Sequence, residues 1–257
     1  MTEIRTCKPS RTHAHQRFAM AVFDMDSTLI DAETINELAK AAGVGELVEQ
    51  ITERAMRGEM DYHEALIQRV SALNGLSLER ALDAVKGMKL MEGANEIVMC
   101  AKSLGLITTM LSCGFTLATE GIGATLGMDH VVSNELVVKD GVLTGEVRGP
   151  LTTQDAKLDA LRKLCDGLGI SLKQCIVIGD GANDLCFFKE AGYSIAFNAK
   201  PVVKRCAHVA VSGKDLKKVI PIFEKLCTEG VQENSHADNN HQPQVGDGGI
   251  LRDVEGD

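Results

Sequence analysis

Two kinds of hydrophobic pattern alternate along the chain. The first is a short, nearly continuous apolar run at residues 18–23, which ends at Asp24 and Asp26. A run of that length and purity predicts a strand buried on both faces, as in a parallel sheet. The second is helical periodicity, which dominates residues 31–89 and is punctuated there by glycines. It predicts helices at about 33–42, 46–57, 62–73 and 78–85.

Helical segments and short apolar runs alternate from residue 93 onward. Helices are expected at about 94–103, 115–126, 154–168, 183–191 and 216–226. Strands are expected at 106–111, 175–178 and 194–197, together with a hairpin of 131–138 and 142–147. Such alternation predicts an α/β fold with a doubly wound, Rossmann-like parallel sheet. The helical block after the first strand then predicts a small α-helical cap domain inserted into this core.

These patterns divide the chain into parts of different character. We expect a flexible N-terminal extension at 1–17, a core domain formed by 18–30 and 90–227, a helical cap domain at 31–89, and a disordered acidic tail at 228–257. The extension is basic and the tail is acidic, and the whole chain has a net charge of −9. This leaves no basic footprint for nucleic acid. A phosphorylated substrate would depend on local cations in its site.

Cysteine usage and hydropathy indicate the cellular compartment of the protein. The chain has eight cysteines without a CxxC pair, which is typical of reduced thiols in a cytoplasmic protein. No stretch reaches the roughly 18 uninterrupted apolar residues of a membrane helix, so we expect no membrane partner. The N-terminus lacks the apolar core of an export signal, and its basic character leaves organelle targeting as a minor alternative. The sequence does not decide the oligomeric state, and a homodimer is one option.

Candidate chemistry gathers where strands end. In doubly wound sheets, ligands bind beyond the carboxyl ends of the strands, and Asp24 and Asp26 leave the first strand on the same side. Alone, this pair fits helix capping and metal binding equally well. The strand at 106–111 is followed by Ser112, Cys113 and Gly114, where a hydroxyl and backbone amides at a strand-to-helix turn would form an anion pocket.

A second acidic pair and one lysine complete the candidate site. Asp180 and Asp184 follow the strand at 175–178 and share a face of the turn. Asp24 and Asp180 are hard oxygen ligands of the kind that Mg²⁺ prefers. Lys157 lies early in a predicted helix and, on its own, would be an ordinary solvated lysine. No GxxxxGK[ST] loop is present, so a nucleotide is not the evident phosphoryl donor. This favours a carboxylate as the nucleophile.

The motifs DMDST, the Ser112 turn, Lys157 and GDGANDL resemble the four motifs of the haloacid dehalogenase-like (HAD) hydrolase superfamily. The chain is most similar to the phosphoserine phosphatase branch, over roughly residues 18–226. Two further stretches carry that closer resemblance, namely the pattern GxMxYxEALxxRV that begins at Gly58 and the segment KDGVLTGEVRG.

This resemblance implies a role for each candidate residue. Asp24 would be the nucleophile that becomes an aspartyl-phosphate, and Asp26 would be the general acid and base. Mg²⁺ would be the cofactor, bound by Asp24, by the backbone carbonyl of Asp26 and by Asp180, with Asp184 acting through metal-bound waters. The residues implied to bind the substrate or its phosphate, in addition to those of the cap, are Ser112, Cys113, Gly114, Lys157 and Asn183.

The cap would choose the substrate. On the predicted helix 62–73, Arg69 interrupts an otherwise apolar face, where its stem could simply cover apolar surface. A guanidinium also suits a substrate carboxylate, and the resemblance favours that role. Glu33, which could simply be a favourable first-turn acid, would meet the substrate ammonium. Met56 and Tyr62 would form an apolar wall that excludes water when the cap closes.

One departure from the family pattern concerns Cys113, which stands where a second glycine is usual. A Cβ there would restrict the backbone or crowd the phosphate. We hypothesise that this thiol, close to cations, is acidified and mildly sensitive to oxidation. Cys186 is interpreted as a packing residue. Only 17 residues precede the first strand, so the regulatory domain that some relatives carry there is not expected.

The resemblance predicts Mg²⁺-dependent hydrolysis of the small molecule O-phospho-L-serine to L-serine and phosphate, the last step of L-serine biosynthesis. One alternative is a HAD phosphatase or phosphotransferase that acts on another small phosphorylated metabolite, such as phosphohomoserine. A second is a catalytically silent protein that binds a phosphorylated ligand. This second alternative is disfavoured because the nucleophile, the lysine and the metal ligands are all retained.

Overall fold

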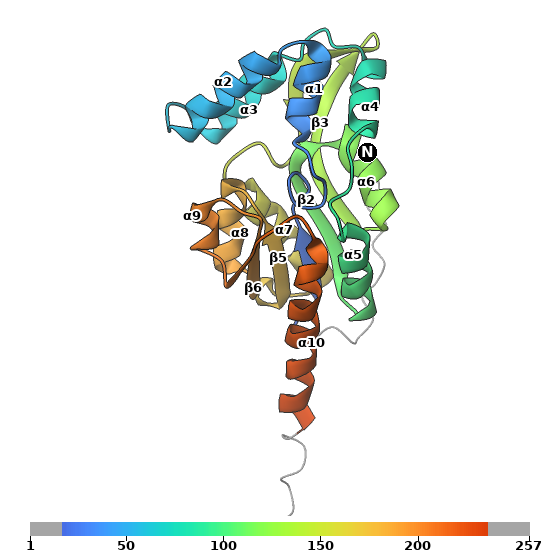
Figure 1. The fold of residues 1–257 in the computed structure, drawn as a ribbon, viewed down its shortest axis with the longest axis vertical. Coiled ribbons are helices and arrows are strands. Elements are labelled where there is room, and N and C mark those ends of the chain that lie inside the picture. Colours follow the sequence, from blue (N-terminus) through green and yellow to red (C-terminus); the bar gives the residue numbers. More distant parts are fainter. Residues whose placement is uncertain (1–16, 236–257) are drawn as a thin grey trace, which may run out of the picture.

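The computed structural model describes residues 17–235 and contains a seven-stranded sheet in the order β4-β3-β2-β1-β5-β6-β7 (Figure 1). All neighbouring strands are parallel except β3 and β4. The central strands are β1 (Met20–Phe23), β2 (Ile107–Phe115) and β5 (Cys175–Gly179). The outer strands are β3 (His130–Lys139), β4 (Val142–Arg148), β6 (Tyr193–Phe197) and β7 (Val209–Val211). The predicted α/β fold is confirmed.

Helices cover both faces of this sheet. On one face lie α5 (Ala94–Ser103), α6 (Thr116–Leu126) and α10 (Ile220–Ser235), and on the other lie α7 (Ala156–Leu168), α8 (Leu185–Glu190) and the short α9 (Pro201–Lys204). Strand β1 shows why two layers form. Ala21 and Phe23 belong to the first hydrophobic cluster, whereas Met20 and Val22 belong to the second, and all four are fully buried. The expectation of a strand buried on both faces is therefore confirmed.

Strand β1 also lies at the topological switch point of the sheet. Its two neighbours, β2 and β5, are both parallel to it, and the strand order runs outward from β1 in both directions. Side chains that follow β1 and β5 consequently meet at one edge, where doubly wound sheets bind ligands. The fold thus places Asp24 and Asp180 on adjacent strand ends.

Residues 31–89 form the expected helical insert, composed of α1 (Thr34–Ala42), α2 (Gly45–Met56), α3 (Tyr62–Ser71) and α4 (Leu78–Lys86). Asp61 and Ser77 begin α3 and α4 by accepting hydrogen bonds from the amides of Glu64 and Arg80. The insert starts and finishes at one place, because the amide of Asp31 donates to the Lys89 carbonyl at 3.0 Å. Its division from the core as a separate domain stays a prediction.

The hairpin β3–β4 turns at Asp140 and Gly141, whose φ angles of 52° and 77° suit a tight two-residue turn. Its outer part pairs with the insert rather than with the core. The amide of Leu143 donates to Leu76 at 2.8 Å, and the amide of Gly75 donates to Leu143 at 2.9 Å. The hairpin falls within the segment that we expect to form the core. Its contact with the insert could not be predicted, because pairing between distant backbone segments leaves no local sequence pattern.

The C-terminal end differs from expectation. Disorder was predicted from residue 228, but α10 continues to Ser235. The buried residues Phe223 and Leu226 fix the first turns of this helix, and a helix that is already nucleated extends at little cost. The rest of the predicted tail and the predicted flexible extension, up to residue 16, lie outside the described residues. Among the described helices, none combines the length and hydropathy needed to cross a membrane.

Candidate active site

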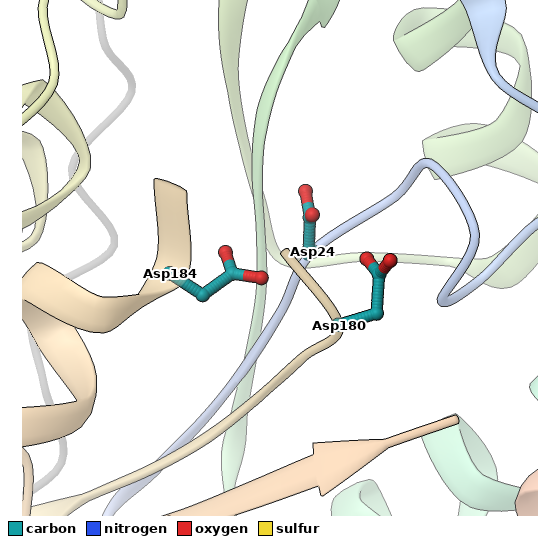
Figure 2. Close-up of side chains that lie close together, drawn as sticks. All are labelled: Asp24, Asp180 and Asp184. Carbon is teal, nitrogen blue, oxygen red and sulfur yellow. The ribbon is translucent and has the colours of Figure 1, made fainter. Parts of the chain in front are cut away.

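Three carboxylates meet at the edge of the sheet (Figure 2). Asp24 follows β1, Asp180 follows β5, and Asp184 ends the short helical turn Ala182–Asp184. One oxygen from each lies within 4.8 Å of the others. The carboxylate of Asp184 also lies against the backbone of Gly179 at the end of β5, where a Cβ would collide with it. The structure thus brings these three predicted residues together.

Lys157 lies against the same carboxylates. Its Nζ is 2.7 Å from Oδ1 of Asp24 and 2.7 Å from Oδ1 of Asp184, and its side chain is 1% exposed. The interpretation of Lys157 as an ordinary solvated lysine is therefore wrong. Burial opposes the charged form, but Asp184 and Asp24 outweigh it and raise the pKa of Lys157 well above its usual value. The side chain is an ammonium group at neutral pH.

The negative charge in this pocket exceeds what one ammonium group can balance. Burial raises the pKa of Asp24 well above its usual value, and Asp184 and Asp180 add to this shift against the opposing effect of Lys157. Burial, followed by Asp184 and Glu33, raises the pKa of Asp180 to about 7. An all-oxygen donor set with unbalanced negative charge fits a hard divalent cation. Asp24, Asp180 and Asp184 are the residues that could hold it.

Asp26 lies beside this cluster but has different partners. Its Oδ1 accepts hydrogen bonds from the amide of Thr34 at 3.1 Å and from Oγ1 of Thr34 at 2.5 Å. Burial, followed by the charge of Glu33, raises the pKa of Asp26 to about 7 despite these hydrogen bonds. A carboxyl group with such a pKa can hold or release a proton near neutral pH. Asp26 also satisfies the first amide of α1, so the capping and chemical interpretations both apply.

Glu33 lies near both Asp26 and Asp180, whose pKa values its charge raises. Its Oε1 accepts a hydrogen bond of 2.7 Å from Ser27, and its side chain is exposed. Ser27 has a φ of 55°, an uncommon conformation for a residue other than glycine. The local backbone thus holds a carboxylate that a ligand can reach at the edge of the pocket.

The predicted anion pocket lies in an irregular part of β2 rather than in a turn after it. The strand runs to Phe115, and its pairing with β3 shifts between Leu111 and Phe115, which is the signature of a bulge. Within the bulge, the amide of Gly114 donates to Oγ of Ser112 at 3.0 Å. A Cβ on Gly114 would lie 3.3 Å from Oδ2 of Asp26, so the bulge directly adjoins the acidic pocket.

Cys113 projects toward two groups from other elements. Its Sγ accepts a hydrogen bond of 3.7 Å from Nδ2 of Asn183, and it interacts with the hydroxyl of Tyr62 on α3. Burial raises the pKa of the Cys113 thiol above its usual value, and this effect exceeds the lowering by Lys157. The hypothesis of an acidified thiol is therefore wrong. Proximity to a cation does not compensate for the loss of solvent.

Two predicted substrate residues share a face of α3, whereas a third lies apart. The charge of Arg69 acts on the hydroxyl of Tyr62, and its Nε donates to the Ala65 carbonyl at 3.1 Å. Burial is the main cause that raises the pKa of Tyr62, so its hydroxyl stays protonated. Met56 is 67% exposed at the end of α2 and belongs to none of the hydrophobic clusters among the described residues. The wall expected from Met56 and Tyr62 is not assembled in this conformation.

Asn134 on β3 is a site residue that sequence reasoning missed. It is fully buried, and its Nδ2 donates to the carbonyls of Cys113 at 3.2 Å and Leu151 at 3.0 Å. Its Oδ1 accepts from the amide of Leu151 at 2.8 Å. Asn134 thereby ties the bulge to the connection that leads into α7 and Lys157. The available signal was an amide side chain within a predicted strand.

The chain matches the haloacid dehalogenase-like hydrolase family over residues 21–189. It is 41% identical over 201 residues to phosphoserine phosphatase of Methanocaldococcus jannaschii, an alignment that covers 78% of this chain and 95% of that protein. It is also 41% identical over 207 residues to phosphoserine phosphatase of Streptococcus thermophilus, covering 80% and 96%.

Solved structures give the same picture. A phospho-aspartyl intermediate analogue of phosphoserine phosphatase superposes with a TM-score of 0.76 at 40% identity, covering 80% of this chain and 98% of that one. A substrate-bound phosphoserine phosphatase complex matches with the same values. The similarity therefore extends over nearly the full length of these proteins.

Proposed function

The chain belongs to the haloacid dehalogenase-like hydrolase family and is a phosphatase, and from this premise we propose that it hydrolyses O-phospho-L-serine to L-serine and phosphate. The observation that carries the proposal is the buried Asp24, which forms an ion pair with Lys157. Two positions further along the chain, Asp26 has a carboxyl group suited to proton transfer. The phosphoserine phosphatases at 41% identity support the choice of substrate.

In the first step, a carboxylate oxygen of Asp24 attacks phosphorus as the bond from phosphorus to the serine oxygen breaks. Protonated Asp26 gives its proton to the departing serine oxygen, and an aspartyl-phosphate forms on Asp24. Lys157 offsets negative charge on the phosphoryl oxygens, while Ser112 and the amides of the bulge hold them. Asp24, Lys157 and Ser112 are buried in the structure, whereas Asp26 is half-buried.

In the second step, water attacks the phosphorus of the aspartyl-phosphate. Asp26, now ionised, accepts the proton of the water, phosphate leaves, and the carboxylate of Asp24 is restored. The same carboxyl group thus acts as acid and then as base, for which a pKa of about 7 is suitable.

We propose Mg²⁺ as the cation, held by Asp24, Asp180 and the backbone carbonyl of Asp26. When bound, the ion supplies Lewis-acid stabilisation of charge on the phosphoryl group. Asp184 would act through metal-bound water, and it also orients Lys157 through a 2.7 Å hydrogen bond. Asn183 would support the phosphate side, next to Cys113. The oxygen donor set and its excess negative charge support this assignment.

Substrate choice is assigned to residues of the insert. Arg69 would bind the carboxylate of phosphoserine and Glu33 its ammonium, with Tyr62 and Met56 closing the apolar side. The exposed carboxylate of Glu33 and the position of Arg69 beside Tyr62 support these roles. The insert would then recognise the substrate, and the edge of the core sheet would carry the groups that transfer the phosphoryl group.

A panel of phosphomonoesters tests the proposed substrate. The values of kcat/KM would be compared in the presence of Mg²⁺ for phosphoserine, phosphohomoserine, phosphocholine and an aryl phosphate. We expect phosphoserine to give the highest value. A higher value for another ester, or transfer of the phosphoryl group to an added alcohol in preference to water, would overturn the assignment.

The remaining proposals concern the setting of the enzyme. We propose that it supplies the last step of L-serine biosynthesis in the cytoplasm. The described cysteines all carry free thiols, which supports a reducing compartment. A silent binding protein is disfavoured because the ionic contacts of Asp24, Lys157 and Asp184 are intact.

A further inference from the structure

The first turn of α3 makes a polar contact with a segment far away in the sequence. Nδ1 of His63 lies 2.9 Å from the backbone oxygen of Thr152, 89 residues further along the chain. A carbonyl oxygen can only accept, so the imidazole ring donates through Nδ1. His63 is exposed and Thr152 is half-buried. The hydrogen bond joins the helical insert to the connection between β4 and α7.

The connection is held on both sides of Thr152. Leu151 is tied to the buried Asn134 by hydrogen bonds of 2.8 and 3.0 Å. After residue 155 the chain enters α7, whose second residue is Lys157, fixed between two carboxylates. The Thr152 carbonyl therefore lies in a segment that is held in place at Leu151 and at Lys157.

The other side of the contact is a well-formed helix start. Asp61 accepts from the amide of Glu64 at 2.8 Å, which fixes the first turn of α3. Tyr62, next to His63, interacts with Cys113 in the bulge of β2. Arg69 lies further along the same helix, on the side of Tyr62. A single rigid helix thus carries the contact with the core and the proposed substrate guanidinium.

We propose that His63 is a positioning residue for the phosphatase reaction. Its hydrogen bond to Thr152 seats α3 on the connection into α7 and thereby sets the distance between Arg69 and Lys157. A substrate that spans these two cations needs this distance to be fixed. The inference rests on the proposed function, because it assumes a substrate with a carboxylate as well as a phosphate.

The size of the effect follows from the kind of contact. The net contribution of one hydrogen bond shifts a two-state equilibrium by about two- to tenfold. Loss of the His63 contact should therefore lower kcat/KM for phosphoserine by that factor, mainly through KM. An aryl phosphate without a carboxylate does not engage Arg69, so its kcat/KM should change by less than about twofold.

Three variants separate positioning from a general structural role. His63→Ala removes the donor, whereas His63→Asn retains a donor because the amide nitrogen of Asn can take the place of Nδ1. Gln68→Ala is the matched control, since the hydrogen bond of Gln68 to Glu64 stays within α3. For each protein, kcat and KM would be measured on both substrates, and amide hydrogen exchange would be followed in residues 149–155.

We expect His63→Ala to raise KM for phosphoserine and to speed exchange in the connection, His63→Asn to restore both, and Gln68→Ala to change neither. Equal losses on both substrates, or unchanged exchange in His63→Ala, would overturn the proposal. Failure of the wild-type protein to prefer phosphoserine would instead count against the proposed function. In that case the exchange measurement still decides whether His63 holds the connection.

Discussion

At the scale of single residues, the candidate site gathers several carboxyl groups around one buried ammonium group. Asp24 and Asp184 share one ammonium group, and Asp180 and Asp26 lie beside them with pKa values raised to about 7. A pocket with this excess of carboxylates attracts cations and holds a proton on one of its acids. Both properties serve the transfer of a phosphoryl group.

Asp24→Asn should lower kcat for phosphoserine by at least about a thousandfold, because an amide oxygen is a poor nucleophile and a weak metal ligand. The measurement is steady-state turnover, with circular dichroism to show that the fold is retained. Asp31→Asn is a suitable control, since Asp31 is an exposed neighbour that pairs with Lys214 at 2.7 Å. Turnover of the Asp24 variant within tenfold of the wild type would contradict a covalent mechanism.

Arg69→Ala should reduce kcat/KM for phosphoserine by roughly 10- to 100-fold, which corresponds to one hydrogen-bonded charge pair. The same change should have little effect on an aryl phosphate. Arg57→Ala serves as the control, because Arg57 is an exposed arginine of the insert that pairs with Glu59 at 2.6 Å. A similar loss on both substrates would mean that Arg69 has a structural role.

Residues whose position follows from strand ends could be placed from the sequence, whereas those with backbone partners could not. Asp24 and Asp180 come directly after apolar runs, so their meeting follows from a parallel sheet. Asn134 and His63 act on carbonyl groups far away in the chain, and nothing in their immediate sequence indicates those partners. The sign of the Cys113 pKa shift was also beyond reach, because it depends on burial.

At the scale of elements, strand β3 does more than extend the sheet. Its first half pairs with β2, its second half pairs with β4, and Asn134 lies where the two halves join. From there the buried amide bridges the bulge of β2 and the connection into α7. The sequence indicated the strand and its hairpin, but the hydrophobic pattern carries no information on a side chain that binds backbone.

Asn134→Ala should lower the free energy of unfolding by about 2 kcal/mol or more, because buried backbone groups at Leu151 and Cys113 lose their partners. It should also lower kcat, since Ser112 and Lys157 lie on the segments that Asn134 joins. Urea unfolding and turnover would be measured together. Ser133→Ala is the matched control, because the hydroxyl of the adjacent residue Ser133 forms a hydrogen bond of 2.7 Å with the side chain of Thr119 rather than with the bulge or the connection. Equal effects of the two substitutions would refute the bridging role.

The boundaries of helices and strands differ in how well the local sequence pattern predicts them. The helices of the insert begin and end within two residues of the predicted positions, because capping residues and glycines mark them. Strand β7 and helix α9 were not predicted, since both are short and mostly half-buried or exposed. The extension of β2 through Phe115 was missed because Ser112, Cys113 and Gly114 interrupt its run of large apolar residues.

At the scale of the whole molecule, an acidic protein binds an anionic substrate by concentrating cations in one place. The net charge of −9 disfavours phosphoserine at long range. Lys157 and a bound divalent ion would reverse the sign of the field only within the pocket. The doubly wound topology makes this possible, because it delivers Asp24 and Asp180 to one edge of the sheet.

Mg²⁺ should stabilise the folded protein, because it binds a site that the unfolded chain does not form. At a hundredfold excess over the dissociation constant, the gain is about 2.7 kcal/mol, or roughly 5–10 °C in Tm. Thermal unfolding would be followed with Mg²⁺ and with NaCl at equal ionic strength. Asp180→Asn should lose most of the gain. An equal rise in this variant would show that the ion binds elsewhere.

The backbone bonds of the insert also define what could be exchanged between related enzymes. Asp31 and Lys89 are held together, so residues 31–89 could be replaced there without opening the sheet. A transplant of that segment alone would fail to match at Leu143, whose amide and carbonyl groups pair with Leu76 and Gly75. The unit that would have to be exchanged therefore consists of two segments, the helical insert and the tip of the hairpin. New substrate preferences should be easier to acquire when both segments change together.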